Sequence, residues 1–354
     1  MTATADRPAR ALDLPPFFCP IPSAGHPDAE RIDGDSLAWV AGLDAVGPGG
    51  LGRLARGRRG LAAAWAHPQG IPERVRVPAD LMYLADALRD GTPPPGARRL
   101  HAALGRLAAA AEPPGAPDAL DDPWLRGVRD VRRRLVQWAT PLQAARWGGA
   151  WRRLLMGWSW EAAVLAEGAV PGLDEYVALR AYGSAGAESL TVLIDAVDGY
   201  EVPARQLEAL PVRALTEMNW LVTALDEDLC RYEHGRRDRL NVVDVVARAE
   251  GCSADQAVPS VVSMRDRVMC LFLRLGTQVS AYASYELRRY VDGLGRQVRA
   301  GIDRGTGRRS GPFAPDGPPG IRVRPGPVCT DVPRDDRHEP VGVPAVAWWW
   351  DQLL

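Results

Sequence analysis

The feature that most constrains the fold is a helical pattern that continues, with short interruptions, from about Asp35 to about Gly301. Apolar residues recur there at helical spacing, whereas alternating runs of β-branched residues, which are typical of strands, do not occur. Breaks rich in Gly and Pro, such as 68–72 and 168–172, divide the pattern into separate helices. The sequence therefore predicts an all-α fold in which about ten helices form one domain.

The two ends of the chain differ from this helical body, residues 31–305. Residues 1–30 are rich in proline and predict an extended N-terminal strap. Residues 306–354 form a tail rich in Pro, Gly and Arg, whose composition cannot bury enough apolar surface to fold by itself. We expect this tail to lie over the helical body or to be disordered. Its end, AVAWWWDQLL, carries three tryptophans that would either cap a pocket or be buried at a homodimer interface.

Composition excludes several classes of function. The 354 residues carry a net charge of −1 and include no lysine, so all 43 basic residues are arginines. Schiff-base chemistry and a P-loop lysine are therefore excluded, and any phosphate group must be held by arginine, backbone amides or a metal ion. A nearly neutral chain without a clustered basic helix is not expected to bind nucleic acid.

The sequence also predicts a cytoplasmic protein. It has no run of about eighteen apolar residues, so no membrane span is expected. The first ten residues lack the basic-then-apolar order of a signal peptide. The five cysteines are far apart and form no CxxC pair, which is typical of a reducing compartment.

The first segment with candidate functional residues is PADLMYLADALRDG, residues 78–91. Asp86 and Asp90 are four residues apart, so on a helix both carboxylates point from one face near its C-terminal end. Two acids at that end oppose the helix dipole, which is unfavourable unless a cation is bound. A solvated helix end is the alternative interpretation.

The second segment is NWLVTALDEDLCRYEHGRRDRLNVVDVV, residues 219–246. Asp and His side chains bind divalent ions, whereas Cys is a poor partner for Mg²⁺. The alternative is a charged surface helix with ion pairs between acids and arginines. The candidates that share one helix face are Asp226, Cys230 and His234, and those on the adjacent face are Glu227 and Arg231.

Arg180 lies in a third segment, LDEYVALRAYGSAG, just before a Gly- and Ser-rich break. An arginine at a helix break can hold an anion bidentately beside free backbone amides, although a plain surface arginine also fits the pattern. A dense tryptophan set nearby has two interpretations as well, core packing or the lining of a cavity for an apolar ligand or a cation. These residues are Trp138, Trp147, Trp151, Trp158 and Trp160.

Together these segments resemble the bacterial class I terpene synthases over roughly residues 15–312. The segment with Asp86 and Asp90 is similar to the helix that carries the family's DDxxD motif. The segment around Arg180 is similar to the one with its diphosphate-sensing arginine, and LDEDLCRYEHGRRDRLNVVDVV resembles the stretch with its second metal motif, NDxxSxxxE. PFFCPIPSAGHPDA resembles the family's opening, and SYELRRYVDGLGRQVRAGIDRGTGRRSG resembles its last long helix and the loop after it.

The resemblance implies a class I terpenoid synthase-like helical bundle around a central apolar, aromatic-lined cavity. In such an enzyme Mg²⁺ ions and basic side chains hold a prenyl diphosphate (C15 or C20) at the mouth, the diphosphate leaves, and the carbocation cyclises inside. The implied catalytic residues are Arg180, Asp86 and Asp90; the implied metal ligands are Asp86, Asp90, Asp226, Glu227, Cys230 and His234; the implied diphosphate ligands are Arg180, Arg231, Arg308 and Arg309.

The motifs depart from the family pattern. Ala87 stands where the second aspartate of the first motif is expected, and the usual C-terminal Arg-Tyr pair is replaced at Arg308, Arg309 and Ser310. The register of the second motif is open. One register aligns its Asn, Ser and Glu with Asp226, Cys230 and His234, and the register shifted by one aligns them with Glu227, Arg231 and Gly235.

Three functions stay open at this point. The chain is a diphosphate-dependent cyclase with an altered metal set, or an enzyme of the same fold that acts on another isoprenoid, such as one already cyclised, with a weaker dependence on Mg²⁺. The third alternative is a catalytically silent member that binds a ligand or partner without ionising a diphosphate. Arg231, if it faces the pocket, would place a cation where a metal ion is expected.

Overall fold

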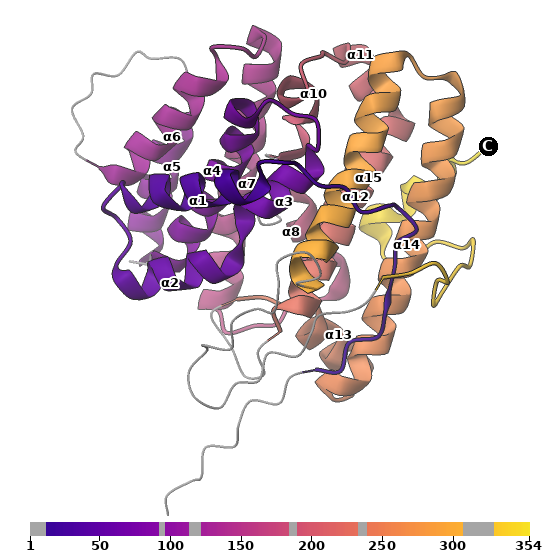
Figure 1. Ribbon diagram of the computed structural model, residues 1–354. Helices are drawn as coiled ribbons and strands as arrows, with labels where there is room; N and C mark the ends of the chain where they lie inside the picture. Colours follow the sequence, from indigo (N-terminus) through magenta and orange to yellow (C-terminus); the bar gives the residue numbers. More distant parts are fainter. Residues whose placement is uncertain (1–11, 92–95, 113–121, 184–189, 233–238, 307–328) are drawn as a thin grey trace, which may run out of the picture.

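The computed structural model describes residues 12–91, 96–112, 122–183, 190–232, 239–306 and 329–354. Within these ranges the chain is helical almost throughout, which confirms the all-α fold (Figure 1). None of the described helices is both long and apolar enough to cross a membrane. The elements are β1 (Phe17–Phe18), α1 (Ala29–Ala41), α2 (Pro48–Gly57), α3 (Arg59–Ala66), α4 (Pro72–Gly91), α5 (Gly96–Ala110), α6 (Pro123–Leu135), α7 (Pro141–Ala166), α8 (Leu173–Gly183), α10 (Ile194–Val197), α11 (Ala204–Leu207), α12 (Leu210–Cys230), α13 (Val242–Glu250), α14 (Ala254–Tyr282), α15 (Tyr285–Thr306), β2 (Cys329–Thr330) and the 3₁₀ helix η1 (Pro344–Gln352).

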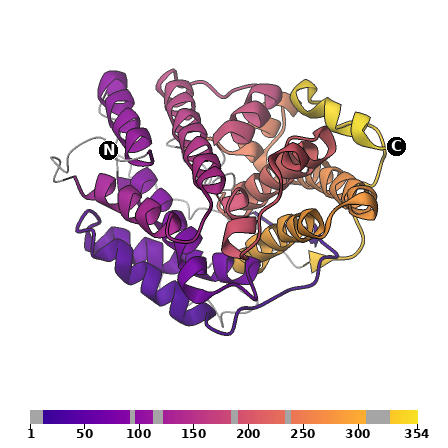
Figure 2. The same cartoon turned by 90° about the horizontal axis from the view of Figure 1, so that it is seen from above.

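The helices form two packed groups (Figures 1 and 2). One group, α1 with α3 to α7, buries an apolar cluster that includes Leu61 and Trp151. The other, α8 with α12 to α15, buries a second cluster that includes Val222 and Met269. The two groups meet where α3 packs against α15. Elements of both groups therefore face one another along this seam.

Local sequence determines where several helices begin and end. At the start of α14 the Ser253 hydroxyl accepts a hydrogen bond from the NH of Gln256, and the Gln256 side chain accepts one from the NH of Ser253, so a capping box begins this helix. Gly251 ends α13 at φ 63°, a left-handed conformation that glycine adopts without a steric penalty. The predicted breaks at 68–72 and 168–172 separate α3 from α4 and α7 from α8.

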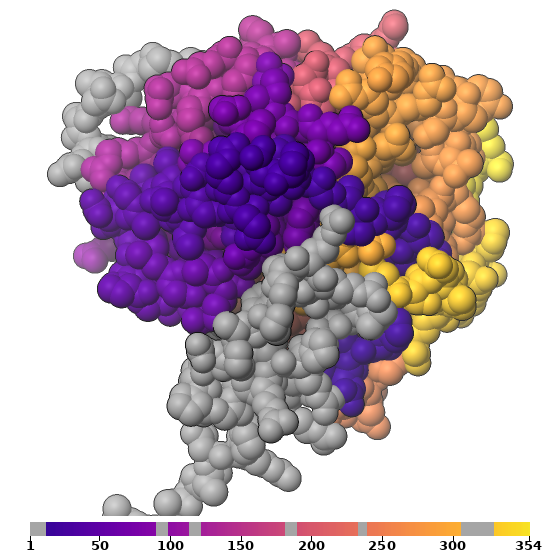
Figure 3. Space-filling view, viewed as in Figure 1, coloured from indigo at the N-terminus to yellow at the C-terminus, as the bar shows by residue number. Residues whose placement is uncertain are grey.

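The N-terminal segment runs across the second helix group and is held there by polar contacts (Figures 1 and 3). β1 pairs in parallel with β2, with Phe17 opposite Cys329. The NH of Phe18 donates to Asp266 Oδ1 at 3.3 Å, and its carbonyl accepts a hydrogen bond from Arg265. Segments from near both ends of the chain are therefore fastened together against α14.

The described end of the C-terminal tail, residues 329–354, packs against the helices of its own chain. It finishes in η1, which contacts α8 and α12. Trp349 is fully buried there, and its indole NH donates to Glu217 Oε2 at 3.1 Å. Trp349 is therefore a core residue of this chain rather than a cap over a pocket.

Within the dense tryptophan set, Trp147, Trp151 and Trp158 of α7 pack in or against the core of the first helix group, which is the first of the two interpretations. Trp147 and Trp151 are fully buried and stack with their ring centroids 6.3 Å apart. The indole NH of Trp151 donates to the Leu107 carbonyl of α5 at 3.0 Å, and Trp158 meets Trp151 edge-on. These rings therefore join α5 to α7 and position the first helix group.

Candidate active site

A pocket lies at the seam between the two helix groups. Its walls are α3, α4, α12 and α15, and it contains about 650 Å³ of space between atoms, counting its open mouth. Most of its described lining residues are small or apolar and none of them is Phe, Trp or Tyr, so the aromatic lining implied by the resemblance is not found there. The lining residues are Arg59, Ala62, Ala63, Ala66, His67, Pro78, Met82, Leu190, Asn219, Thr223, Ala224, Glu227, Gln297, Gly301 and Arg304.

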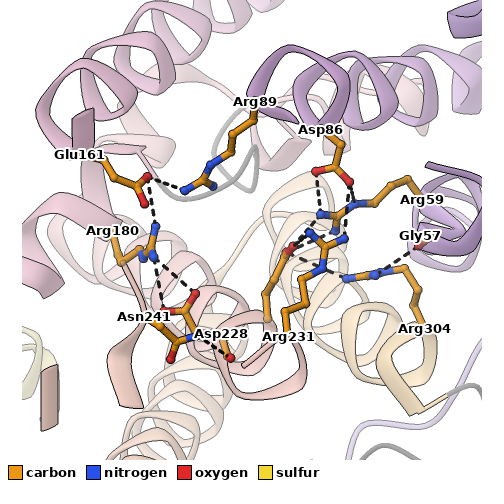
Figure 4. Close-up of polar contacts among 11 residues, drawn as sticks. Gly57, Arg59, Asp86, Arg89, Glu161, Arg180, Asp228, Arg231, Asn241 and Arg304 are labelled. Carbon is orange, nitrogen blue, oxygen red and sulfur yellow. Dashed lines mark hydrogen bonds and ion pairs between the residues drawn. The ribbon is translucent and has the colours of Figure 1, made fainter. Parts of the chain in front are cut away.

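At the mouth of this pocket the guanidinium of Arg59 joins acidic residues from two facing helices (Figure 4). Its Nε and Nη2 donate to the two carboxylate oxygens of Asp86 on α4, at 2.6 and 2.9 Å. Its Nη2 and Nη1 also donate to Glu227 on α12, at 2.6 and 3.3 Å. The Arg59 side chain is 3% exposed, so these charge-assisted bonds form largely away from water. One arginine therefore connects the walls that carry the two predicted metal motifs.

The backbone around Arg59 explains its position. Arg58 adopts a left-handed conformation, with φ 45° and ψ 43°, which ends α2 and lets α3 begin directly at Arg59. The following residue lies against α1, because a Cβ added to Gly60 would meet the Asp33 Cα at 2.5 Å. Glycine at position 60 therefore allows the close approach of α3 to α1 that places the Arg59 guanidinium at the mouth.

Two further arginines reach the same carboxylates. Arg231, which ends α12, lies 3.5 Å from Asp86 Oδ2 and 3.1 Å from Glu227 Oε1. Arg304 of α15 lies 4.0 Å from Glu227 Oε2, and it donates to the Gly57 carbonyl at 3.3 Å. Among the side chains described at the mouth, three positive charges therefore face two negative ones. We call this set the mouth cluster: Arg59, Asp86, Glu227, Arg231 and Arg304.

The arginines keep the acids of the mouth cluster ionised. Burial raises the pKa of Asp86, but the charges of Arg59 and Arg231 outweigh it and bring the pKa to about 2. The same arginines overcome burial at Glu227 and hold its pKa well below its ordinary value. Burial and the charge of Arg59 lower the pKa of Arg304 to about 10. Arg304 therefore stays charged at neutral pH, but the nearby Glu227 does not fully offset burial and the charge of Arg59.

Arg180 belongs to a separate network, seen on the left of Figure 4. Its Nε donates to the Tyr176 hydroxyl at 2.9 Å, and its Nη2 donates to the Leu240 carbonyl at 2.6 Å. Asp228 of α12 lies 3.4 Å from that Nη2 and also accepts hydrogen bonds from Tyr176 and from the NH of Val242. The buried Arg180 therefore ties α8 to α12 and to the start of α13.

Glu161 of α7 extends this network to α4. It accepts hydrogen bonds from Arg89 and, at 3.1 Å, from the NH of Leu240, and it lies 3.8 Å from Arg180 Nη1. Burial raises the pKa of Glu161, but Arg89 and Arg180 outweigh it and hold the pKa below its ordinary value. Arg89 and Asp86 both lie on α4, so this helix contributes to both networks.

The structure brings together only part of the predicted second motif. Asp226 is buried against Arg265 of α14, with Nε 2.8 Å from Oδ1, and it does not join Asp86. Glu227 and Arg231, which the shifted register aligns with the motif, are the residues that reach Asp86. A helix turns about 100° per residue, so the adjacent side chains of Asp226 and Glu227 point in different directions. Asp226 meets Arg265 of α14, whereas Glu227 meets Arg59 of α3.

The other predicted residues are placed only in part. Cys230 is exposed at the end of α12. Asp90 lies in the last turn of α4, but its side chain is outside the described part of the structure. His234, Arg308 and Arg309 lie outside the described residues.

Arg59 and Arg304 are candidate functional residues that the sequence did not reveal. The only local signal is the arginine pair at the start of RRGLAAAW, which is equally typical of a solvated helix start. The partner of Arg59 on α12 is 168 positions away in the chain. Helical periodicity carries no information about such a contact.

The described acids fit a metal ion only in part. No group of three or more His, Cys, Asp or Glu side chains suited to a metal ion occurs among the described residues. Asp86 and Glu227 do offer carboxylate oxygens, the ligands that Mg²⁺ prefers, from facing helices. Both carboxylates bond to the same Nη2 atom of Arg59, at 2.9 and 2.6 Å, so a cation between them would take the place of that group. Binding of a metal ion to this pair would therefore require the Arg59 guanidinium to move away.

Comparison with known proteins assigns this architecture to a class of enzyme. A family model described as terpene synthase family 2, C-terminal metal binding, matches residues 81–269, which include Asp86, Arg180 and Glu227. The fold is therefore that of a class I terpene synthase: an all-α bundle with an apolar pocket below a cluster of charged side chains. The chain belongs to the terpene synthase family and is a terpene cyclase, as its motifs indicated.

Individual relatives cover nearly the whole chain. Bonnadiene synthase from Allokutzneria albata is 36% identical over 98% of this chain and 99% of its own length. A synthase from Streptomyces clavuligerus, named for (+)-T-muurolol and for cyclising (2E,6E)-farnesyl diphosphate, is 29% identical over 94% of this chain and 81% of its own. The crystal structure of SVS_A2, a protein from ancestral sequence reconstruction, is similar with a TM-score of 0.84 at 30% identity, covering 96% of this chain and 99% of that one.

Proposed function

We propose that this chain ionises a C15 or C20 prenyl diphosphate at the mouth cluster and cyclises the resulting carbocation in the pocket beneath it. The observation that carries the proposal is that the mouth cluster shares residues with the rim of a mostly apolar pocket, namely Arg59, Glu227 and Arg304. The relative named for cyclising farnesyl diphosphate supports this substrate class.

In the proposed first step, the bond between C1 of the prenyl chain and the diphosphate oxygen breaks. The electron pair leaves with the diphosphate, so negative charge grows on its oxygens, and guanidinium groups beside them lower the barrier. Arg59, Arg231 and Arg304 are the described donors at this place. A Mg²⁺ ion held by Asp86 and Glu227, with Asp90 as a further candidate ligand, would add positive charge at the same leaving group.

The pocket provides the surroundings for cyclisation. Alanines on α3 and α12, among them Ala62, Ala66 and Ala224, leave space for the chain, and the apolar lining keeps water from the carbocation. The reaction ends when the cation loses a proton to the released diphosphate, or when a water oxygen adds to it and the resulting oxonium loses a proton to the same acceptor. Thr223 Oγ1 lines the pocket, is buried and has no hydrogen-bond partner among the described groups, so it is available to hold the water of that last step by a hydrogen bond.

Arg180 has a positioning role in this proposal. The resemblance implies that it senses the diphosphate, yet its guanidinium is held by Tyr176, Leu240, Asp228 and Glu161. It reaches a diphosphate only by giving up one of these partners. Because Asp228 is adjacent to Glu227 on α12, such an exchange would act on the mouth cluster through that helix.

The metal set is altered relative to the family pattern in this proposal. Ala87 of α4 cannot supply the oxygen of the second aspartate, and Arg231 brings a positive charge in place of the serine of the second motif. Fewer carboxylates and more guanidinium groups therefore surround the diphosphate, so we expect a weaker dependence on Mg²⁺ than the intact motifs would have.

The experiment uses the purified protein with geranyl, farnesyl or geranylgeranyl diphosphate, and separately with an already cyclised prenyl diphosphate, in buffer with MgCl₂ or with EDTA. We expect release of inorganic diphosphate and, by gas chromatography with mass spectrometry, a cyclic hydrocarbon or alcohol. A product formed only from an already cyclised diphosphate would identify the chain as an enzyme for another isoprenoid. The absence of product from all of these substrates with Mg²⁺ present would indicate a silent family member.

A further inference from the structure

We propose that Arg59, Arg231 and Arg304 form a diphosphate-binding site that works without a metal ion. Arg59 lies between Asp86 and Glu227 and bonds to both, and in this proposal it exchanges these carboxylates for phosphate oxygens when diphosphate binds. The inference rests on the proposed function, because it identifies the residues that hold the leaving group of that reaction.

The charge balance at the mouth is the first argument. Three guanidinium groups contact two carboxylates among the described side chains, which leaves one positive charge without a counter-ion. The acids are only 14–16% exposed, and an unbalanced charge in such surroundings is unfavourable unless an anion is bound. Diphosphate supplies several negative charges, and planar guanidinium groups bind phosphate oxygens bidentately.

The unused hydrogen-bond donors are the second argument. Nε of Arg304 is buried and has no hydrogen-bond partner among the described residues. Within the described part of the chain, the other polar contacts of this side chain are weak ones, a carbonyl at 3.3 Å and a carboxylate oxygen at 4.0 Å. Arg231 is 36% exposed and therefore turns toward a ligand at the mouth with little loss of packing. Both arginines have donors to offer an anion.

The position of Arg59 adds the third argument. Phosphate oxygens accept the same bonds as the carboxylates of Asp86 and Glu227, so the exchange costs Arg59 no hydrogen bonds. The exchange also frees both carboxylates for a cation. Binding of the anion then favours binding of the cation, and by thermodynamic reciprocity the cation favours the anion.

The probe for this site is inorganic diphosphate, titrated by calorimetry into the full-length protein in EDTA. We expect measurable binding by the wild type and a loss of affinity of about tenfold or more in Arg59→Met and in Arg304→Met, since each removes a charge-assisted pair. Arg133→Met is the matched control, because Arg133 is an exposed arginine on α6 that pairs with Asp130. Circular dichroism and thermal melting verify that each variant is folded.

Asp86→Asn provides the most specific test. It removes a carboxylate that competes for Arg59, so metal-free diphosphate is expected to bind several-fold more tightly than it binds the wild type. A residue that serves only as a metal ligand would leave metal-free binding unchanged. Wild-type protein that binds diphosphate only with Mg²⁺, or Arg59→Met and Asp86→Asn variants that both bind in EDTA as the wild type does, would overturn the proposal.

Turnover separates this inference from the proposed function. A wild-type protein that cyclises a prenyl diphosphate but shows no metal-free diphosphate binding contradicts the inference alone. A protein that binds inorganic diphosphate in EDTA, loses this binding in Arg59→Met and turns over no prenyl diphosphate contradicts the proposed function alone. Titration with sulfate in EDTA shows whether the site prefers diphosphate to another anion. Equal affinity for sulfate and for inorganic diphosphate would contradict a site that is specific for diphosphate.

Discussion

Arg59 Nη2 and Glu227 Oε1 lie 2.6 Å apart, although the two residues are separated by 168 positions in the chain. Arg59 is the first residue of α3, and Glu227 lies in the last turn of α12. The ion pair therefore joins the two helix groups at the rim of the pocket. Because the same guanidinium also holds Asp86, a change in any of these three residues alters the arrangement of the mouth.

Asp86→Ala is expected to lower kcat/KM for a prenyl diphosphate in the presence of Mg²⁺ by about a hundredfold or more. The substitution removes both a carboxylate ligand and the group that positions Arg59, and loss of one electrostatic contributor in an active site has effects of this order. Asp130→Ala, at a partly exposed acid of α6, is the control and should retain its activity. Unchanged turnover of Asp86→Ala would remove Asp86 from the proposed site.

Gly60→Ala is expected to destabilise the fold by about 1–3 kcal/mol and to lower turnover of the folded protein, because overpacking moves α3. The added Cβ would meet the Asp33 Cα at 2.5 Å, and backbone does not give way as a flexible side chain does. Thermal melting and assays of the folded variant measure the two effects. Gly149→Ala on α7 is the matched control, since nothing lies within 4 Å of the Cβ it adds. Equal melting temperatures for Gly60→Ala and the wild type would show that α3 has room at this position.

Thr223→Val is expected to change the ratio of products rather than the stability. It replaces the buried hydroxyl in the pocket lining, which has no hydrogen-bond partner among the described residues, by a methyl group of similar size. We expect a smaller share of alcohol or a different double-bond isomer, measured by gas chromatography with mass spectrometry. Thr277→Val, at an exposed hydroxyl of α14 that bonds to the Leu273 carbonyl, should leave the products unchanged. An identical profile for both variants and the wild type would exclude Thr223 from product control.

Glu161→Gln is expected to lower the melting temperature at neutral pH and to have little effect in acid. Burial is outweighed by Arg89 and Arg180, so the pKa of Glu161 lies below its ordinary value of 4.5 in the folded protein. The unfolded chain therefore takes up the proton first, and the stability that this carboxylate contributes is present above about pH 4.5 and is lost as the pH falls below it. Melting curves from pH 7 to pH 3 measure the difference. The exposed Glu175→Gln on α8 is the control, and a difference between Glu161→Gln and the wild type that does not shrink in acid would contradict the assignment.

Much of the fold was predictable because helix formation depends on near neighbours. The cap at Ser253, the end of α13 at Gly251 and the breaks between helices each involve residues within about one turn of one another. Asp86 could be assigned to a helix end for the same reason. The register of the second motif could not, because Asp226 and Glu227 are adjacent acids and local patterning does not say which one faces α4.

The sequence by itself determined an all-α terpene synthase, through helical periodicity, caps and three segments that resemble the family's motifs. Only the tertiary structure decided which charges meet at the mouth. The rotation of α12 directs Glu227 to the pocket and Asp226 to Arg265, and the close approach of α3 to α1 brings Arg59 between the two walls. These contacts depend on how helices far apart in the chain pack together, and that packing is a property of the whole fold.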